Sequence, residues 1–205
     1  MMLIGLTGPA GAGKDTVADL LVHHHGFRKT SFAESLYREV SDAFDLPVTD
    51  LARRDTKETS MDGLEMVFCH DLDFVEVVQR LEGNAFDWHI PYSPRQILQW
   101  WGTDYRRAQN QDYWIDQVRQ RIHIGSSSIH WVIPDVRFQN EADLIHEMGG
   151  QFILVRRQGV QPVAGHVSEA FWRACHADGS LDNDGAVDDL LPILERMVVP
   201  SVLIQ

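Results

Sequence analysis

The sequence predicts a three-layer α/β protein in which helices cover both faces of a parallel sheet of about five strands. Its length of 205 residues suits one domain, or one domain with an inserted flap, and such a chain can bury about 70% of its unfolded surface. Short apolar runs alternate with amphipathic segments, which is typical of a parallel sheet. The first apolar run, residues 2–6, leads directly into a glycine-rich loop and then a helix.

The helix after this loop is predicted over residues 16–25. Val17, Leu20 and Leu21 recur at the spacing that places apolar side chains on one helix face. Gly26 follows as a stop signal, because glycine readily adopts the left-handed backbone that commonly ends a helix.

A second strand and a second helix come next. Residues 27–32 are expected to form the strand and residues 33–44 the helix. Leu36, Val40 and Phe44 stand four residues apart, which is a helical spacing.

The middle of the chain carries the weakest pattern. Residues 48–92 are expected to form an insertion or flap, in which only residues 72–81 look helical. The next helix has a clear start, because Ser93 can cap it and Pro94 can occupy its first position. We expect this helix to end near Gly102.

The last part of the chain returns to regular alternation. The apolar runs HWVI and QFILV predict short strands at residues 130–133 and 151–155. The other elements expected here are helices at residues 112–122, 140–148, 168–175 and 186–197, and a terminal strand or tail at residues 198–204.

Composition and charge limit the class of protein. Hydrophobic residues make up 44% and charged residues 23% of the chain, which argues against intrinsic disorder. The net charge, 18 Lys+Arg minus 30 Asp+Glu, is −12. Duplex nucleic acid binding usually requires a basic surface, so we expect no such partner. A small anionic ligand stays compatible, because a pocket can be locally basic in an acidic protein.

The cysteines and apolar segments give no sign of a metal ribbon or a membrane anchor. The two cysteines, Cys69 and Cys175, form no CxxC pair. No apolar stretch approaches the roughly 18 residues of a membrane span, and the N-terminus lacks the basic region of a signal peptide. We therefore expect a cytoplasmic protein with no membrane partner.

Residues 8–16, GPAGAGKDT, carry the sharpest functional signal. They match the pattern GxxxxGK and lie between an apolar strand and a helix. The glycines let successive backbone N–H groups and the helix N-terminus surround phosphate oxygens. Lys14 is expected to reach the β- and γ-phosphates of a bound nucleotide. The nucleotide-binding residues are expected to be Gly8, Ala10, Gly11, Ala12, Gly13, Lys14, Asp15 and Thr16.

Asp15 departs from the usual pattern. A Ser or Thr that contacts magnesium normally follows the lysine, but a carboxylate can also serve Mg²⁺, directly or through water. Asp15 is therefore expected on the magnesium side of the site, whereas Thr16 points elsewhere on the helix. The alternative is that Asp15 only favours the helix dipole from the first turn.

Further blocks accompany the loop in a fixed order. They are residues 5–21, 31–36, 54–58, 93–104 with Arg107 and residues 112–114, 135–142, and 166–169. With these blocks the chain resembles the deoxynucleoside monophosphate kinases typical of tailed bacteriophages, which have the P-loop nucleoside monophosphate kinase fold. The departures include Glu34 and Ser35, where that family has Asp and Pro, and Tyr37, where a basic residue often stands. Residues 60–92 and 174–184 match least well.

The resemblance implies an enzyme that uses ATP and Mg²⁺ to phosphorylate a deoxynucleoside 5′-monophosphate directly. It also implies a single kinase domain with a monophosphate-binding region at about residues 33–110 and a short lid at about residues 156–168. The family often works as a homodimer, and the sequence shows no interface that would decide this. Neither the base of the acceptor nor the role of residues 48–92 follows from the sequence.

Arginines are expected at the acceptor, because its phosphate is a dianion. The candidates are Arg54, Arg95, Arg107 and Arg137. Arg137 follows a presumed central strand, at the edge of the sheet where α/β proteins bind ligands. Asp135 is expected to meet magnesium or to orient Arg137. The alternatives are a structural Asp135–Arg137 ion pair and a surface role for Arg95.

Other side chains complete the expected site. Gln99 lies four residues after Arg95 and its amide suits a base edge. Trp114 is expected to stack on a base, although tryptophan in such a helix is more often core. Arg157, at the start of the lid, is expected to neutralise the transferring phosphoryl group, with Arg156 and Arg173 as the alternatives. Arg106 is expected to be a solvated charge.

Two other functions remain open at this point. One is a different P-loop kinase, of the dephospho-coenzyme A or phosphomevalonate type, which the phosphate loop alone does not exclude. The other is a non-catalytic nucleotide-binding module, which the intact Gly8, Gly13 and Lys14 argue against.

Overall fold

Five parallel strands form the sheet of the protein, as the sequence predicts. The computed structural model describes all residues except 54, 126–127, 161–166 and 199–205. The strands are β1 (Leu3–Thr7), β2 (Arg28–Lys29), β3 (Trp131–Ile133), β4 (Gln151–Arg156) and β5 (Gly179–Asp182). Their order across the sheet is β2-β3-β1-β4-β5, and every neighbouring pair is parallel.

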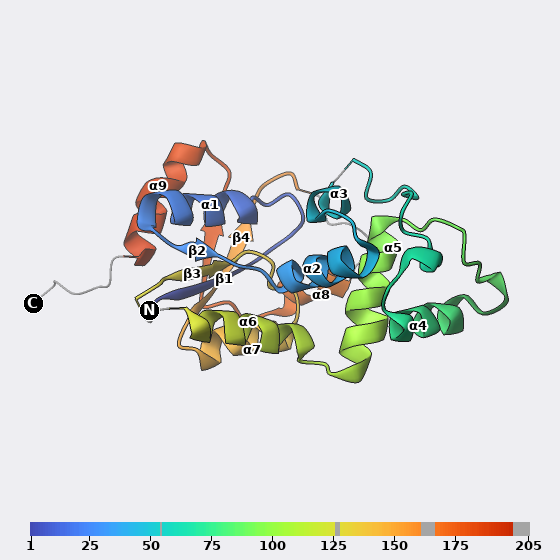
Figure 1. Cartoon of the computed structure of the whole chain (residues 1–205). Helices are drawn as coiled ribbons and strands as arrows, with labels where there is room; N and C mark the ends of the chain where they lie inside the picture. Colours follow the sequence, from blue (N-terminus) through green and yellow to red (C-terminus); the bar gives the residue numbers. More distant parts are fainter. Residues whose placement is uncertain (54, 126–127, 161–166, 199–205) are drawn as a thin grey trace, which may run out of the picture. The chain divides into compact units, whose positions relative to one another are not determined.

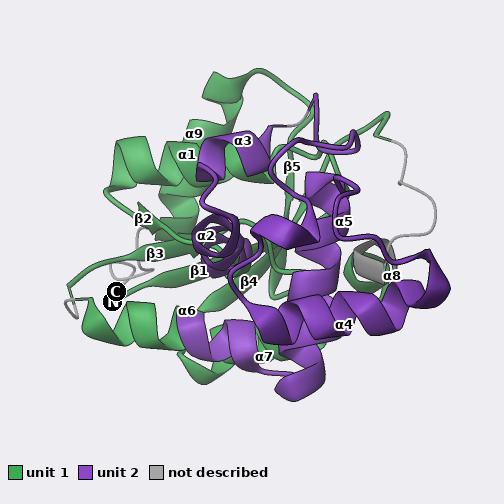
Figure 2. Ribbon diagram, turned by 45° about the vertical axis from the view of Figure 1, so that its right-hand side comes forward, with its two compact units in different colours: residues 1–32, 118–205 green, residues 33–117 purple. Residues whose placement is uncertain are grey.

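The chain divides into two compact units (Figure 2). The first unit is Met1–Phe32 with Val118–Gln205 and contains the whole sheet. The second unit is Ala33–Gln117 and is helical in its regular elements. The second unit includes the predicted monophosphate-binding region, residues 33–110. That role of the region stays a prediction.

The helices of the first unit lie on both faces of its sheet (Figure 1). They are α1 (Lys14–His25), the second half of α6 (Tyr113–Ile124), α7 (Gln139–Glu147), α8 (Val167–Ala174) and α9 (Val187–Val198). Helices α1 and α9 lie together on one face, and α7 packs against β1 and β4 from the other. This arrangement confirms the predicted α/β fold.

The core of the first unit forms where α1 meets the central strands. All five residues of β1 are buried, and α1 buries Val17, Ala18 and Leu21 against them. Leu190 and Leu194 of α9 join the same cluster. Each fully buried aliphatic side chain of this kind stabilises the fold by about 1.5–3 kcal/mol relative to exposure.

The fifth strand differs from the one that the sequence predicts. It is Gly179–Asp182, whereas a terminal strand or tail was expected at residues 198–204. Val198 instead ends α9, and residues 199–205 lie outside the described part of the chain. β5 was missed because Leu181 is its one buried residue. Such an edge strand shows neither an apolar run nor a regular alternation.

The second unit contains short helices joined by irregular segments. They are α2 (Phe32–Phe44), α3 (Val48–Ala52), η1 (Met66–Phe68), α4 (Leu72–Glu82), η2 (Gly83–Ala85), α5 (Pro94–Gln99), the π-helix η3 (Trp100–Arg107) and the first half of α6. The predicted start at Ser93 is confirmed, because its side chain accepts a hydrogen bond from Gln96 N. The predicted end near Gly102 is wrong, because η3 continues the helix to Arg107.

An aromatic cluster fills the core of the second unit. Phe74 of α4 is fully buried, and its ring centroid lies 4.5 Å from Trp101 and 5.7 Å from Tyr105. Phe44 approaches the same ring edge-on at 6.5 Å. Aromatic pairs at these separations contribute about 0.5–1.5 kcal/mol beyond their buried area.

Arg106 is not the solvated charge that the sequence suggests. Its side chain is only 19% exposed, its Nε lies 2.7 Å from Glu39 Oε2, and its guanidinium lies 4.3 Å from the Tyr105 ring centroid. The π-helix explains the difference. In i→i+5 geometry, residues five apart lie on nearly the same side of the helix. Arg106 therefore lies on the buried side that carries Trp101. In an α-helix, residue 106 would point away from that side.

No helix in the described part of the chain is long and apolar enough to cross a lipid bilayer.

Replacing Arg106 by alanine is expected to lower the free energy of unfolding by about 3 kcal/mol, because the half-buried Glu39 carboxylate loses its cation. Urea unfolding measures the change. Arg38, on α2 beside Glu39, is the matched control: its side chain is 65% exposed and pairs with Glu34 one turn away. Arg38→Ala is expected to cost at most about 0.5 kcal/mol. Equal losses in the two variants would contradict the structural role of Arg106.

Candidate phosphate-binding site

The glycine-rich loop lies where the sheet changes winding direction. The chain leaves β1 through α1 toward β2, and it leaves the neighbouring strand β3 through α7 toward β4 on the other side. The carboxyl ends of two such strands form the crevice in which open α/β sheets bind ligands. Val136 N donates to Leu6 O at 3.2 Å and ties the segment after β3 to the end of β1.

The loop has a backbone shape that requires glycine. Gly8, Gly11 and Gly13 have φ values of 140°, 81° and 89°, a region that side-chain-bearing residues rarely adopt. Ala12 between them is fully buried, and Gly13 is the residue from which α1 begins. The loop therefore presents backbone N–H groups and a helix N-terminus at one point, which is the arrangement that binds phosphate.

Lys14 curls back over this loop. Its Nζ donates to Gly8 O at 2.7 Å and to Pro9 O at 2.9 Å. The two carbonyl groups fix the ammonium at the mouth of the loop, where it can contact phosphate oxygens.

Asp15 meets a cation from β2. Lys29 Nζ lies 3.0 Å from Asp15 Oδ1 and 3.0 Å from Asp19 Oδ1, one turn further along α1. Burial lowers the pKa of Lys29, but the hydrogen bonds to the two carboxylates outweigh it, so that pKa lies above its ordinary value. The Asp15 side chain is 61% exposed and remains accessible at the N-terminal turn of α1.

The segment after β3 is held by a buried glutamate. Glu141 is 2% exposed, and its Oε2 accepts hydrogen bonds from the backbone N of Arg137 and of Phe138 at 2.7 and 3.2 Å. Asp135 Oδ1 accepts from Phe32 N at 3.1 Å, while the Arg137 side chain is exposed. Glu141 belongs to the motif at residues 135–142, but the sequence does not indicate that its side chain binds the backbone.

Val155 of β4, the strand next to β1, and Asn183, which follows β5, approach the phosphate loop closely. A Cβ at Gly8 would lie 2.1 Å from Val155 O, and one at Gly13 would lie 2.1 Å from Asn183 Nδ2. Asn183 is 6% exposed and donates to Ala12 O at 2.9 Å. Asn183 was missed because it follows the unpredicted strand β5, and no local pattern marks it.

The predicted lid begins at the end of β4. Arg156 and Arg157 are exposed there. The rest of the predicted lid, including His166, falls mostly on residues 161–166, outside the described part of the chain. The role of the lid and of Arg157 stays a prediction.

The expected acceptor residues lie in the second unit, apart from Arg137. Arg95 Nε donates to Glu58 Oε1 at 2.8 Å, and its backbone N donates to Lys57 O at 2.9 Å. Gln99 is exposed and Arg107 is half-buried. Arg54 lies outside the described residues. None of these observations tests an acceptor role.

Trp114 occupies the core rather than a surface. It is 3% exposed, and its Nε1 donates to Gly102 O at 3.1 Å. A ring packed on all sides and hydrogen-bonded to the backbone stabilises the unit. The contacts thus favour the core interpretation over base stacking, and we leave Trp114 out of the acceptor site proposed below.

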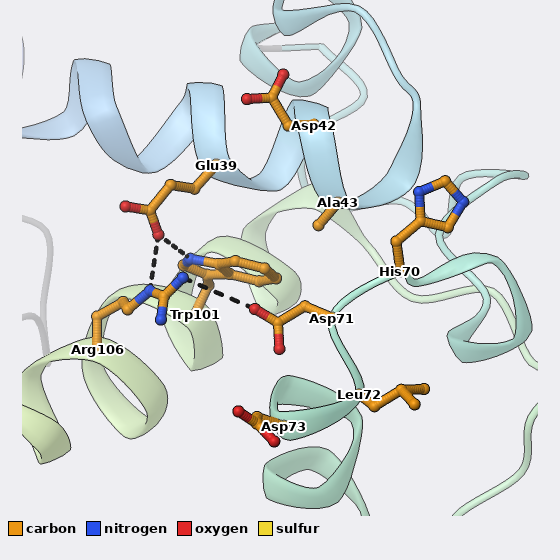
Figure 3. A pocket seen from close by; sticks show the side chains of 9 residues that line it. All are labelled: Glu39, Asp42, Ala43, His70, Asp71, Leu72, Asp73, Trp101 and Arg106. Atoms are coloured by element: carbon orange, nitrogen blue, oxygen red, sulfur yellow. Dashed lines mark hydrogen bonds and ion pairs between the residues drawn. The ribbon is translucent and has the colours of Figure 1, made fainter.

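A cavity of about 600 Å³ in the second unit is acidic. Figure 3 shows the carboxylates of Glu39, Asp42, Asp71 and Asp73 around the single cation Arg106, which is engaged by two of them. A site of this charge disfavours phosphate. The ion pairs of Arg106 with Glu39 and Asp71 indicate that these side chains stabilise the unit rather than bind an anion.

A family model and two relatives agree on one family. A family model described as deoxynucleotide monophosphate kinase matches residues 67–193. A protein of Acanthamoeba polyphaga mimivirus, named as a deoxynucleotide monophosphate kinase, is 31% identical over 191 residues, covering 85% of this chain and 83% of its own. The deoxynucleoside-5′-monophosphate kinase of Escherichia phage T5 is 28% identical over 181 residues, covering 71% and 72%.

Among solved structures, shikimate kinase from Aquifex aeolicus aligns over 95% of both chains with 11% identity and a TM-score of 0.44. The dephospho-CoA kinase from Campylobacter jejuni aligns over 95% of this chain and 96% of its own with 11% identity and a TM-score of 0.45. At these TM-scores the likeness adds nothing to the assignment.

Replacing Gly8 by alanine is expected to lower the free energy of unfolding by about 3 kcal/mol or more, because the new methyl group meets the Val155 carbonyl. Gly11→Ala is the matched control. Its φ is also positive, at 81° against 140° for Gly8, but its Cβ would meet only Val160 Cγ1 at 3.8 Å. We expect it to cost about 1–2 kcal/mol from backbone strain alone. Chemical denaturation compares the two, and equal costs would argue against the close fit at Gly8.

Proposed function

The chain belongs to the deoxynucleotide monophosphate kinase family, and we propose that it transfers the γ-phosphoryl group of ATP to a deoxynucleoside 5′-monophosphate, giving ADP and the diphosphate. The observation that carries this proposal is the phosphate loop between β1 and α1, with Lys14 over its mouth. Nothing in the reaction requires a covalent enzyme intermediate, so catalysis rests on positioning and electrostatics.

The loop is proposed to bind the phosphates of ATP. Backbone N–H groups of Ala10 to Thr16 surround the phosphate oxygens, and Lys14 contacts the β- and γ-phosphates. On binding, the Lys14 ammonium exchanges its contacts with the Gly8 and Pro9 carbonyls for phosphate oxygens. The ammonium thereby stabilises the charge that develops as the γ-phosphoryl group is transferred.

Asp15 and Asp135 fit a magnesium site of the kind that nucleotide kinases use. Mg²⁺ prefers oxygen ligands and is usually held by one or two carboxylates together with substrate phosphates. Asp15 stands in the first turn after the phosphate loop, and Asp135 follows β3 at the neighbouring strand end. When bound, Mg²⁺ would neutralise charge on the β- and γ-phosphates.

The arginines are proposed to serve the acceptor and the transferred group. Arg137 stands at the end of β3, on a segment that Glu141 fixes, and is assigned to the acceptor phosphate and the reacting group. Arg157 is assigned to the transferred phosphoryl group. In the second unit, Arg54, Arg95 and Arg107 are assigned to the acceptor phosphate, and Gln99 to its base.

The decisive measurement is ADP release with Mg-ATP against dAMP, dGMP, dCMP, dTMP and 5-hydroxymethyl-dUMP. We expect turnover on at least one of them. Lys14→Ala is expected to lower kcat by about 100-fold or more, because an electrostatic contact to the transferred group is lost. Turnover names the base that the enzyme accepts.

A surface variant and a fold check accompany this assay. Arg196→Ala removes an exposed cation on α9 and is expected to leave turnover unchanged. Thermal unfolding of Lys14→Ala shows whether its loss is chemical or structural. ATP binding without turnover on any monophosphate would overturn the proposed reaction and point to another acceptor or to a regulatory module.

Asp15 and Asp19 offer a matched test of the magnesium assignment, because both pair with Lys29 at 3.0 Å. Asp15→Ala is expected to raise the Mg²⁺ concentration for half-maximal turnover about tenfold, whereas Asp19→Ala leaves it within about twofold. A magnesium titration at saturating ATP and acceptor measures both. If the two variants shift equally, Asp15 acts only through Lys29 or the helix dipole.

A further inference from the structure

Two residues after β5 contact both the phosphate loop and the end of β4. Asn183 Nδ2 donates to Ala12 O at 2.9 Å, and Asn183 N donates to Arg156 O at 2.8 Å. Asp184 Oδ1 accepts from Gln158 N at 2.6 Å. One dipeptide therefore joins two segments that are more than 140 residues apart in the sequence.

These contacts bracket Arg157. The carbonyl group before it and the N–H group after it are both hydrogen-bonded, one to Asn183 and one to Asp184. The backbone that carries the Arg157 guanidinium is thus fixed on both sides. The same Asn183 holds the buried turn at Ala12 inside the phosphate loop.

The burial of Asn183 makes its contact difficult to replace. The residue is 6% exposed, and its amide group approaches Gly13 so closely that a Cβ there would lie 2.1 Å from Nδ2. A buried donor or acceptor that loses its partner pays its full desolvation cost. The amide therefore constrains the loop shape together with the glycines.

We propose that Asn183 and Asp184 are positioning residues that couple the phosphate loop to Arg157. Binding of ATP phosphates in the loop and placement of the Arg157 guanidinium at the transferred phosphoryl group are then linked through one dipeptide. This inference rests on the proposed function for the role of Arg157, whereas the part that concerns the loop requires only nucleotide binding.

The two side chains have different expected effects. Asn183 acts on the loop, so its loss weakens ATP binding. Asp184 acts on the Arg157 backbone, so its loss lowers kcat and spares the affinity for ATP, since a contact made only in the transition state affects the chemical step.

The experiment measures the dissociation constant for ATP by calorimetry without acceptor, and kcat with saturating substrates. Asn183→Asp keeps the size of the side chain but replaces the donor facing Ala12 O by an acceptor. It is expected to weaken ATP binding about tenfold. Asp184→Ala is expected to lower kcat about tenfold with the ATP dissociation constant within about twofold. Asp184→Asn keeps an acceptor oxygen and is expected to restore kcat.

A double-mutant cycle tests whether Asp184 acts through Arg157. If it does, Asp184→Ala in an Arg157→Ala background lowers kcat no further than Arg157→Ala alone. If Asp184 has only a general structural role, the losses of kcat from the two substitutions add instead. Asp189→Ala is the matched control, because Asp189 also accepts a hydrogen bond from a backbone N–H, that of Ala186, on the same C-terminal segment at 2.8 Å.

Two outcomes overturn the inference: wild-type ATP affinity in Asn183→Asp, or additive losses in the cycle. Failure of the proposed function looks different. In that case the wild type phosphorylates no monophosphate, yet the calorimetric comparison of Asn183→Asp with Asp189→Ala still decides the part that concerns the loop.

Discussion

The close approach of backbone at the phosphate loop is the constraint on which the rest of the first unit depends. A Cβ at Gly8 would lie 2.1 Å from the Val155 carbonyl oxygen, and one at Gly13 would lie 2.1 Å from the Asn183 amide nitrogen. β4 and the segment after β5 therefore lie directly against the loop. The order of the strands and the shape of the loop therefore depend on each other. Glycine suits these positions because it adopts a positive φ easily and has no side chain to meet the neighbouring strand.

The same constraint determines where charge can be placed. With the loop between β1 and α1, the residues that follow β3 and β4 stand at the same edge of the sheet. This edge receives Asp135 and Arg137 from one strand and Arg157 from another. Glu141 and the residues after β5 hold the segments of Arg137 and Arg157 by their backbone, and both arginine side chains are exposed.

The features that could be predicted from the sequence are those that depend on residues close together in the chain. The phosphate loop, the stop at Gly26 and the cap at Ser93 each follow from a short motif with a local physical cause. Asn183 and Arg106 were missed for the opposite reason. Asn183 matters through a contact with Ala12, 171 residues away, and Arg106 faces inward because η3 has π-helical geometry, which the 3.6-residue period does not reveal.

The acidic composition is compatible with a site for anionic substrates. Carboxylates engage several cations, including Lys29 with Asp15 and Asp19, and Arg95 with Glu58. A net charge of −12 repels a nucleotide only weakly at close range, because salt screens exposed charges beyond about 8 Å. Within that distance, oriented backbone N–H groups at the start of α1 and the Lys14 ammonium supply the attraction. Since such dipoles act only when they are held close to their binding geometry, the buried hydrogen bond from Asn183 to Ala12 O supports the loop from behind.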